Sequence, residues 1–186
     1  EKPVQGCTTL LAQARAKLFA AREQRIRPGR DEKILTSWNA LMIAGMARAA
    51  RVFGRPDWLA SARAALEFIR GTVWREKRGA ARARLLATCM DGRAHLNAYV
   101  DDYAFLLAAL IELMQTDFQS RDLEFAENLA EVLLAQFYDP GPGGFFFTSH
   151  DHEKLIHRPK PGYDSATPSG NAMAALALQR LGHIAG

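Results

Sequence analysis

The chain has 186 residues, of which 48% are hydrophobic, and a formal net charge of +4. This length is sufficient for one domain with a substantial core. The longest apolar run, near Tyr103–Ile111, is far shorter than the roughly 20 residues of a membrane-spanning helix, so the composition indicates a globular protein and no membrane partner is expected.

The charge is distributed unevenly along the chain. Residues 1–95 carry 19 Lys and Arg against 8 Asp and Glu, whereas residues 96–186 carry 5 against 12. A nucleic-acid-binding surface would need the basic residues in one patch with interleaved aromatic rings. Here the arginines are scattered over predicted helix faces and loops, so solvated outer surfaces explain them better and no nucleic-acid partner is expected.

Cysteine usage and the two ends of the chain indicate its context. Cys7 and Cys89 are far apart and form no Cys-x-x-Cys motif, which fits a reducing compartment, and we expect a cytoplasmic protein. The first residues contain no signal-peptide core. The sequence begins without Met and stops at Ala185-Gly186, in or just after a predicted helix, so we expect a fragment.

The first part of the chain predicts three helices. Thr8–Arg25 and Asp57–Val73 each place apolar residues opposite charged ones, as amphipathic helices do. Between them, Trp38–Phe53 is apolar over most of its length and predicts a buried helix. Gly54 is placed to end this helix, and Pro56 to occupy the first turn of the next one.

The middle of the chain predicts a hairpin and then the most buried helix. The run Leu85–Met90 is β-capable and is followed by Asp91-Gly92, a hairpin-turn signal. From Ala104 to Ile111 every residue is apolar, which is typical of a helix buried on all sides. Asp101 and Asp102 stand at its start, where carboxylates can accept hydrogen bonds from free backbone N–H groups.

The last part of the chain repeats the alternation of helix types. Arg121–Phe137 is amphipathic, and the Pro- and Gly-rich stretch Tyr138–Gly144 ends it. Phe145–Thr148 and Leu155–Arg158, separated by six polar residues, predict a second small hairpin. A third buried helix begins near Ser169.

The three buried segments align with one another without a gap, and their starts are 64 and 68 residues apart. Such a period is typical of a repeated supersecondary unit, although shared Ala and Leu content alone would also align three helices. The aligned segments are Asn39–Arg48, Tyr103–Glu112 and Asn171–Arg180.

The lengths of the connections predict how these helices are arranged. Short links follow the buried helices and longer ones precede them, and short links require antiparallel neighbours. All buried helices must then point the same way, with their N-termini at one end. An inner ring of parallel helices wrapped by outer ones, an all-α (α/α) toroid with small β-hairpins in its loops, meets these conditions; a stacked helical solenoid is the alternative.

Four motifs resemble one family of proteins. They are RDEKILTSWNALM at 30–42, YVDDYAF at 99–105, GGFFFT at 143–148 and RPKPGYDSATPSGN at 158–171. In this order they resemble the toroid part of the thioredoxin-domain-containing proteins typified by the spermatogenesis-associated thioredoxin-like protein. The resemblance covers nearly the whole chain from about Thr8.

The resemblance implies a six-hairpin toroid similar to glycosidases and N-acylglucosamine 2-epimerases. Residues 1–186 would form one partial toroid domain, about three of the six hairpins. In the full-length protein a thioredoxin-like domain would be attached at the N-terminal side, and its cysteine motif is not in this sequence.

A toroid would bring polar residues together at the N-terminal mouth of the buried helices. Carboxylates, amides and flat aromatic rings suit a sugar, because they bond its hydroxyls and cover its C–H face, and a concave site with convergent polar groups is the default binding site. The candidate substrate-binding residues are Arg30, Trp38, Asn39, Tyr103, Lys160, Tyr163, Ser169 and Asn171, and the candidate catalytic residues are Asp31, Asp101, Asp102 and Asp164.

Glycosidase chemistry needs two carboxyl groups across a cavity, about 5–5.5 Å apart for retention and about 6.5–9.5 Å for inversion. Asp101 and Asp102 are poor partners for each other, because consecutive residues of a helix diverge. One of them with Asp31 or Asp164 is a better pair, one protonated and the other ionised. Alternatively, Asp101, Asp102 and Ser169 are only helix caps, and Trp38 is part of the core.

Other chemistry has weaker support in the sequence. An epimerase uses a base that titrates near neutral pH, usually histidine, and His95 and His157 are the candidates near the mouth. His150 and His152 have no third ligand at a useful spacing, so no metal and no cofactor are expected. Gly141–Gly144 precedes a Phe-rich run and not a helix, which does not fit a phosphate loop.

Two functions therefore stay open from the sequence. The first is a sugar-processing domain of the epimerase or glycosidase type, with a small carbohydrate as ligand. The second is a non-catalytic toroid that binds a ligand or partner and serves the attached thioredoxin-like domain.

Overall fold

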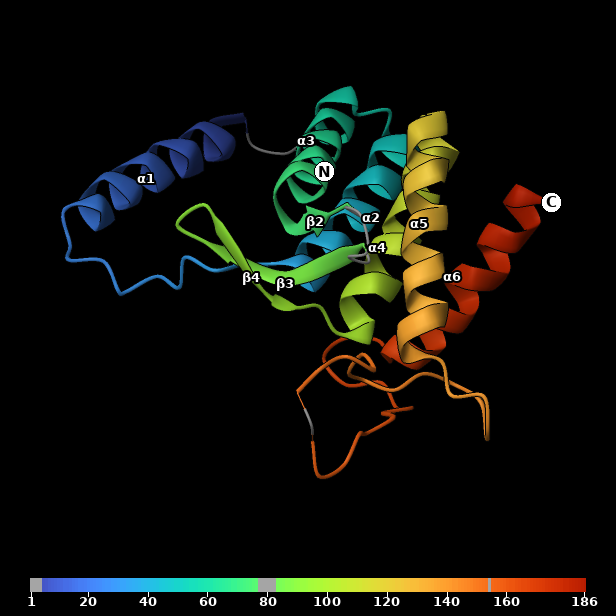
Figure 1. Cartoon of the computed structure of the whole chain (residues 1–186). Coiled ribbons are helices and arrows are strands. Elements are labelled where there is room, and N and C mark those ends of the chain that lie inside the picture. Colours follow the sequence, from blue (N-terminus) through green and yellow to red (C-terminus); the bar gives the residue numbers. More distant parts are fainter. Residues whose placement is uncertain (1–4, 77–82, 154) are drawn as a thin grey trace. The chain divides into compact units, whose positions relative to one another are not determined.

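The structure is a computed structural model that describes residues 5–76, 83–153 and 155–186 (Figure 1). The chain divides into two compact units, Glu1–Glu32 and Lys33–Gly186. In the first unit, α1 (Gln5–Glu23) confirms the predicted N-terminal helix, and its apolar side chains Leu10 and Leu18 are exposed. The assignment of the whole chain to one toroid domain stays a prediction.

The second unit confirms the predicted order of helices. Gly54 ends α2 in the left-handed conformation (φ 64°), and Pro56 opens α3, as expected. No helix in the described ranges is long and apolar enough to cross a membrane. The elements are β1 (Ile34–Leu35), α2 (Thr36–Phe53), α3 (Pro56–Phe68), the π-helical turn η1 (Ile69–Val73), β2 (Trp74–Arg75), β3 (Arg84–Met90), β4 (Arg93–Asn97), α4 (Val100–Thr116), α5 (Ser120–Phe137) and α6 (Gly170–Ala185).

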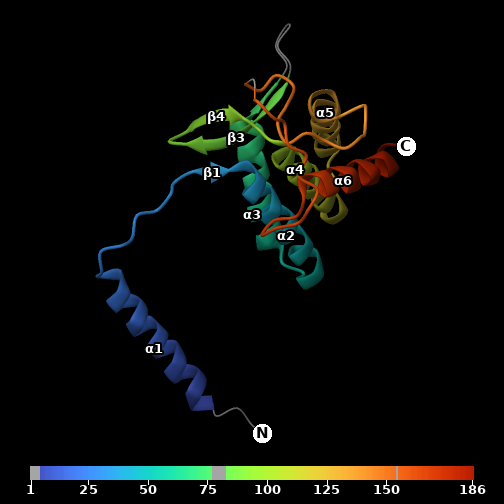
Figure 2. The same cartoon turned by 90° about the horizontal axis from the view of Figure 1, so that it is seen from below.

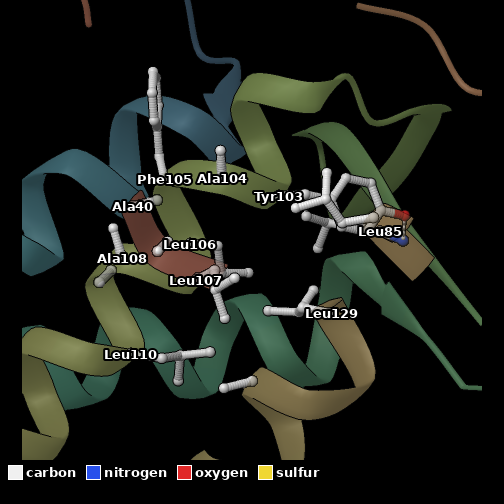
Figure 3. Packing of buried hydrophobic residues seen from close by; sticks show 14 of the residues in the cluster. Ala40, Leu85, Tyr103, Ala104, Phe105, Leu106, Leu107, Ala108, Leu110 and Leu129 are labelled. Atoms are coloured by element: carbon white, nitrogen blue, oxygen red, sulfur yellow. Dashed lines mark hydrogen bonds between the residues drawn. The ribbon is translucent and has the colours of Figure 1, made fainter. Parts of the chain in front are cut away.

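Helix α4 lies at the centre of this unit. It packs against α2 on one side and α6 on the other, while α3 covers α2 and α5 covers α4 (Figures 1 and 2). Its residues from Asp102 to Met114 are all buried, as the all-apolar run predicts. Figure 3 shows Leu106, Leu107 and Leu110 in the core beside Leu129 of α5.

The prediction that all three apolar helices are buried is wrong for α2 and α6. Each of them buries one face, through residues such as Ala40 and Ile43 in α2 and Ala174 and Leu181 in α6. The physical reason is their position, because each packs against only one of the other two apolar helices, whereas α4 packs against both. Their opposite faces expose apolar side chains, including Met42.

The three apolar helices are parallel and in the register of the sequence repeat. The last aligned positions of the three segments, Arg48, Glu112 and Arg180, form one ion-pair group, with Glu112 Oε1 2.8 Å from Arg48 and 3.2 Å from Arg180. At the other end, Asp102 of α4 accepts a hydrogen bond from the backbone N–H of Ser37 in α2. The N-termini of α2 and α4 therefore lie together, as the toroid prediction requires.

A small antiparallel sheet confirms the first predicted hairpin. Strand β3 is the centre of the sheet and pairs antiparallel with β1, β2 and β4. The turn residues Asp91 and Gly92 both have positive φ (51° and 72°), the conformation that a tight hairpin turn of this sequence favours. The sheet covers one end of the core, where Tyr103 of α4 reaches Leu85 of β3 (Figure 3).

The second predicted hairpin is wrong. Phe145 forms only an isolated bridge with Tyr138, and the described part of 155–158 is not strand. The Phe-rich segment is instead bonded to other parts of the chain: the Phe147 carbonyl accepts from Val100 N–H at the start of α4, and Phe147 N–H donates to Pro159. These bonds use the backbone groups that a hairpin would have needed.

Candidate functional site

Asp102 joins the starts of α2 and α4. Its Oδ1 accepts from Ser37 N–H at 2.9 Å and its Oδ2 from Tyr99 N–H at 2.8 Å. The residue is 3% exposed. Burial raises the pKa of Asp102 to about 6, although the two N–H donors partly oppose this effect. Both carboxylate oxygens are thus engaged inside the protein.

Asp101 points in a different direction, towards α6. Its Oδ1 lies so close to Gly170 that a Cβ on this residue would stand 1.9 Å from it, so the packing here requires glycine. The two aspartates diverge, as expected for consecutive helical residues. Asp101 is half-buried, and its Oδ1 has no hydrogen-bond partner among the described residues. Burial raises the pKa of Asp101.

The loop before α6 is held by its own polar side chains. The exposed Asp164 accepts from Ser169 N–H at 2.8 Å, and the Ser169 hydroxyl accepts from Ala172 N–H at 3.4 Å. Asn171 bonds the backbone of Phe145 in both directions, at 2.7 and 2.9 Å, and also the Pro161 carbonyl. Ser169 and Asn171 therefore fix the loop against the start of α6.

Two further candidate residues also have internal partners. Lys160 Nζ lies 2.6 Å from Asp139 Oδ2 and 3.1 Å from the Gly143 carbonyl, and this bond lowers the pKa of Asp139. Asn39 Nδ2 donates to the Leu35 carbonyl at 2.8 Å. These side chains hold the loops around the mouth, and their polar groups face the protein.

Trp38 stands at the edge of an apolar hollow beside the mouth. It is 65% exposed, so it is not part of the core. The hollow has a volume of about 350 Å³ and is lined by Trp38, Leu41, Met42, Gly45 and Thr167. Its lining comes from α2 and from Thr167 in the loop that leads into α6. Figure 2 shows this loop passing beside α2. Sequence reasoning did not find Thr167, because nothing local marks a loop residue that reaches another helix.

The remaining candidates lie elsewhere. Tyr103 is buried, and its hydroxyl accepts from Leu85 N–H at 2.9 Å on the side of the sheet; burial raises the pKa of Tyr103 to about 12. Tyr163 is exposed on the loop before α6. Arg30 and Asp31 belong to the first unit, where Arg30 is paired with Glu32 at 2.6 Å.

The histidines near the mouth have ordinary surroundings. His95 Nδ1 is 3.2 Å from the Arg93 carbonyl on the exposed strand β4, and His157 is exposed. His150 Nδ1 is 3.1 Å from Arg158, and the His152 ring lies beside Tyr99. Within the described residues, no three His, Cys, Asp or Glu side chains are grouped as a metal site requires.

Relatives with similar sequences are much longer than this chain. Human spermatogenesis-associated protein 20 is 32% identical over 187 residues, which span 96% of the chain and 23% of the relative. The mouse protein of the same name is 30% identical over 98% of the chain and 24% of its own length. The chain therefore spans about a quarter of the relatives it matches. No protein-family model matches the chain.

Solved structures with a similar fold are sugar epimerases. Cellobiose 2-epimerase from Bacillus thermoamylovorans superposes with a TM-score of 0.65 at 14% identity, over 83% of this chain and 42% of the enzyme. The enzyme of the same name from Spirochaeta thermophila gives 0.64 at 17% identity, over 84% and 40%. The chain is thus homologous to a segment of spermatogenesis-associated protein 20, and it folds as part of an (α/α) toroid of the six-hairpin type.

Proposed function

We propose that the N-terminal mouth of α2, α4 and α6 is a carbohydrate-binding pocket of an epimerase- or glycosidase-type domain. The observation that carries this proposal is Asp101. Asp102 and Asp164 each accept a hydrogen bond from a backbone N–H, whereas the buried Oδ1 of Asp101 has no hydrogen-bond partner among the described residues. Asp101 is half-buried at the start of α4, and Trp38 near the start of α2 lines the apolar hollow. The fold is similar to that of cellobiose 2-epimerases.

The chemistry follows from the environment of each group. A carboxyl group with a raised pKa keeps its proton closer to neutral pH, so Asp101 can donate a hydrogen bond or a proton to a sugar oxygen. Trp38 offers a flat apolar surface for the C–H face of a pyranose ring. Asp164, exposed on the loop before α6, is the candidate second carboxylate. Asp102 holds the two helix starts in place and does not contact the ligand.

A non-catalytic binding toroid is the second candidate. It is favoured by the internal hydrogen bonds of Asn39, Lys160 and Asn171, because these leave few polar groups free to bind sugar hydroxyls. In this case the domain binds a ligand or partner on behalf of an attached thioredoxin-like domain and has no turnover.

The test is a titration of the chain with glucose, cellobiose and N-acetylglucosamine, followed by tryptophan fluorescence and thermal unfolding. A ligand that binds only the folded state raises its stability, by about 2.7 kcal/mol at roughly 100 times the dissociation constant. We expect Trp38→Ala and Asp101→Asn to weaken binding about tenfold. Trp74→Phe is the control, because the Trp74 indole packs against Phe125 and shares no hollow with Trp38, and it should leave the affinity unchanged.

The outcomes separate the two candidates. If a sugar binds, its incubation with the full-length protein is followed by analysis of the products. Binding without conversion of the sugar supports the non-catalytic toroid. If none of these sugars stabilises the protein, or if Trp38→Ala and Trp74→Phe weaken binding equally, neither candidate function has a sugar-binding pocket at the mouth.

A further inference from the structure

Three arginine side chains converge on one carboxylate in the C-terminal half of the parallel helices. Glu112 of α4 is bonded to Arg48 at 2.8 Å, to Arg180 at 3.2 Å and to Arg51 at 3.4 Å. The Glu112 side chain is only 5% exposed. Burial alone would raise the pKa of Glu112, but the hydrogen bonds and charges of Arg48 and Arg180 outweigh it and lower this pKa.

This group has more positive charge than its one carboxylate neutralises. No other carboxylate within the described residues forms an ion pair with Arg48, Arg51 or Arg180, so two positive charges are in excess.

A second arginine cluster in the same unit is balanced and shows the contrast. Its ion pairs join α3 to α5 and involve three arginines and three carboxylates. Arg63 pairs with Asp117 and Asp122, Arg70 pairs with Asp122 and Glu67, and Arg121 pairs with Glu67. This chain thus neutralises its arginines where they serve only to join helices, which makes the excess around Glu112 distinctive.

The excess charge is accessible. The Arg48 side chain is 64% exposed, and those of Arg51 and Arg180 are 37% and 32% exposed. The negative ends of the helix dipoles offset little of the charge of Arg48 and Arg180, because their effect falls off within the last turn and α2 and α6 end five residues beyond these two arginines. Only Arg51 lies in the last turn of α2, so the dipole offsets part of its charge alone.

We propose that Arg48, Arg51 and Arg180 form a binding site for a small dianion of the phosphate type, with Glu112 holding the guanidinium groups in position. A guanidinium binds phosphate oxygens with paired N–H groups, and pre-orientation lowers the entropy cost of each bond. Two excess charges match a dianion better than a monoanion. The anion lies on the exposed side of Arg48 and Arg51, since Glu112 occupies the buried side.

This site is separate from the carbohydrate pocket. Asp101 and Glu112 are eleven residues apart on α4, which corresponds to about 16 Å along the helix. The proposal therefore does not depend on the proposed function, and either can fail alone.

The experiment is an isothermal titration of the chain with inorganic phosphate and, separately, with methyl phosphate, at constant ionic strength set with chloride. We expect saturable binding of one anion per chain, weakened roughly five- to tenfold in Arg48→Gln and in Arg180→Gln. Arg121→Gln removes one positive charge from the balanced cluster and is the matched control, with unchanged affinity expected. Tighter binding of methyl phosphate than of inorganic phosphate would identify a phosphate monoester as the ligand.

Glu112→Gln gives an independent readout. Gln keeps one oxygen that can accept from the guanidinium groups and so retains part of their positioning, while the central negative charge is removed. Phosphate binding should therefore become stronger while the joint between the helices becomes weaker, and weaker phosphate binding would count against the proposal. Arg48→Gln keeps the test valid if Glu112→Gln does not fold, because Arg48 is mostly exposed. Absence of saturable binding, or an equal loss in Arg121→Gln and Arg48→Gln, would overturn the proposal.

Discussion

Replacement of Asp102 by Asn tests which of two opposing effects controls a buried carboxylate. Burial disfavours its ionised form, while the N–H groups of Ser37 and Tyr99 and the positive ends of α2 and α4 favour it. We expect burial to prevail, as the pKa of about 6 indicates. An Asn side chain resembles the protonated acid in size and cannot ionise, but its NH2 group cannot accept from one of the two backbone N–H groups. Asp102→Asn therefore removes the titration and adds a loss of stability that does not depend on pH, so only the pH dependence of the difference is informative.

The sign of the effect follows from proton binding. With a pKa of about 6 when folded and about 3.8 when unfolded, Asp102 binds more protons in the folded state between these values. The free energy of unfolding then falls as the pH rises through this window. The full difference is about 3 kcal/mol, reached above pH 6 and absent below pH 4. Glu112, Asp139 and Asp151 act in the opposite direction, because their pKa values are lowered in the folded state.

The assay is urea unfolding of wild type and Asp102→Asn from pH 4 to pH 8. Subtracting the two curves cancels the other carboxylates, and we expect the wild type to lose about 3 kcal/mol relative to the variant across this range. Asp164→Asn, which removes an exposed carboxylate bonded to one backbone N–H, is the control and should not show this fall. Parallel curves for wild type and Asp102→Asn, or a difference of opposite sign, would refute the reasoning, because the N–H donors would then outweigh burial.

Three further changes test the packing. Gly170→Ala would place a Cβ 1.9 Å from Asp101 Oδ1 and should lower the free energy of unfolding by about 1–3 kcal/mol through overpacking. Most of this loss should be recovered when Asp101→Ala is added. Urea unfolding of the wild type, the two single variants and the double variant measures this, and an equal cost of Gly170→Ala with and without Asp101→Ala contradicts it. Tyr103→Phe leaves the buried Leu85 N–H unpaired and should lower the free energy of unfolding by about 1–3 kcal/mol, measured by urea denaturation. An unchanged free energy of unfolding would mean that water replaces the hydroxyl. Leu110→Ala, at a fully buried position, should cost about 2–5 kcal/mol, and a cost below 1 kcal/mol would show that α4 is not the centre of the core.

The fold could be predicted from sequence because its helices are specified locally. The apolar run of α4 and the Gly54 and Pro56 signals depend on neighbouring residues, and they agree with the structure. The repeat even predicted which residues share a level, since Arg48 and Glu112 occupy its last aligned position and form an ion pair. The hairpin after Phe145 failed because distant backbone groups, which no local pattern reveals, bind this segment.

The candidate site was predicted less well, because side-chain direction depends on tertiary contacts. Tyr103 and Asn171 were predicted to bind substrate because of their residue types and their positions at helix starts. In the structure Tyr103 faces the sheet, and Asn171 is hydrogen-bonded to the backbone of Phe145. Gly170, which fixes the place of Asp101, was overlooked as an ordinary helix-start glycine. Its signal would have been a small residue at the same level of the repeat as Asp102, sixty-eight positions earlier.

The parallel arrangement of the helices itself explains why acids gather at the mouth. Three helix N-termini together carry positive partial charges that favour carboxylates, and Asp102 and Asp164 accept hydrogen bonds from such backbone N–H groups. A cluster of acids at this mouth is therefore expected in a purely structural toroid, and their number is no argument for catalysis. Asp101 differs, because its Oδ1 is bonded to no described group and its burial raises its pKa. A carboxyl group kept in that state stabilises nothing within the described residues, which is why the carbohydrate proposal is tested first at this side chain.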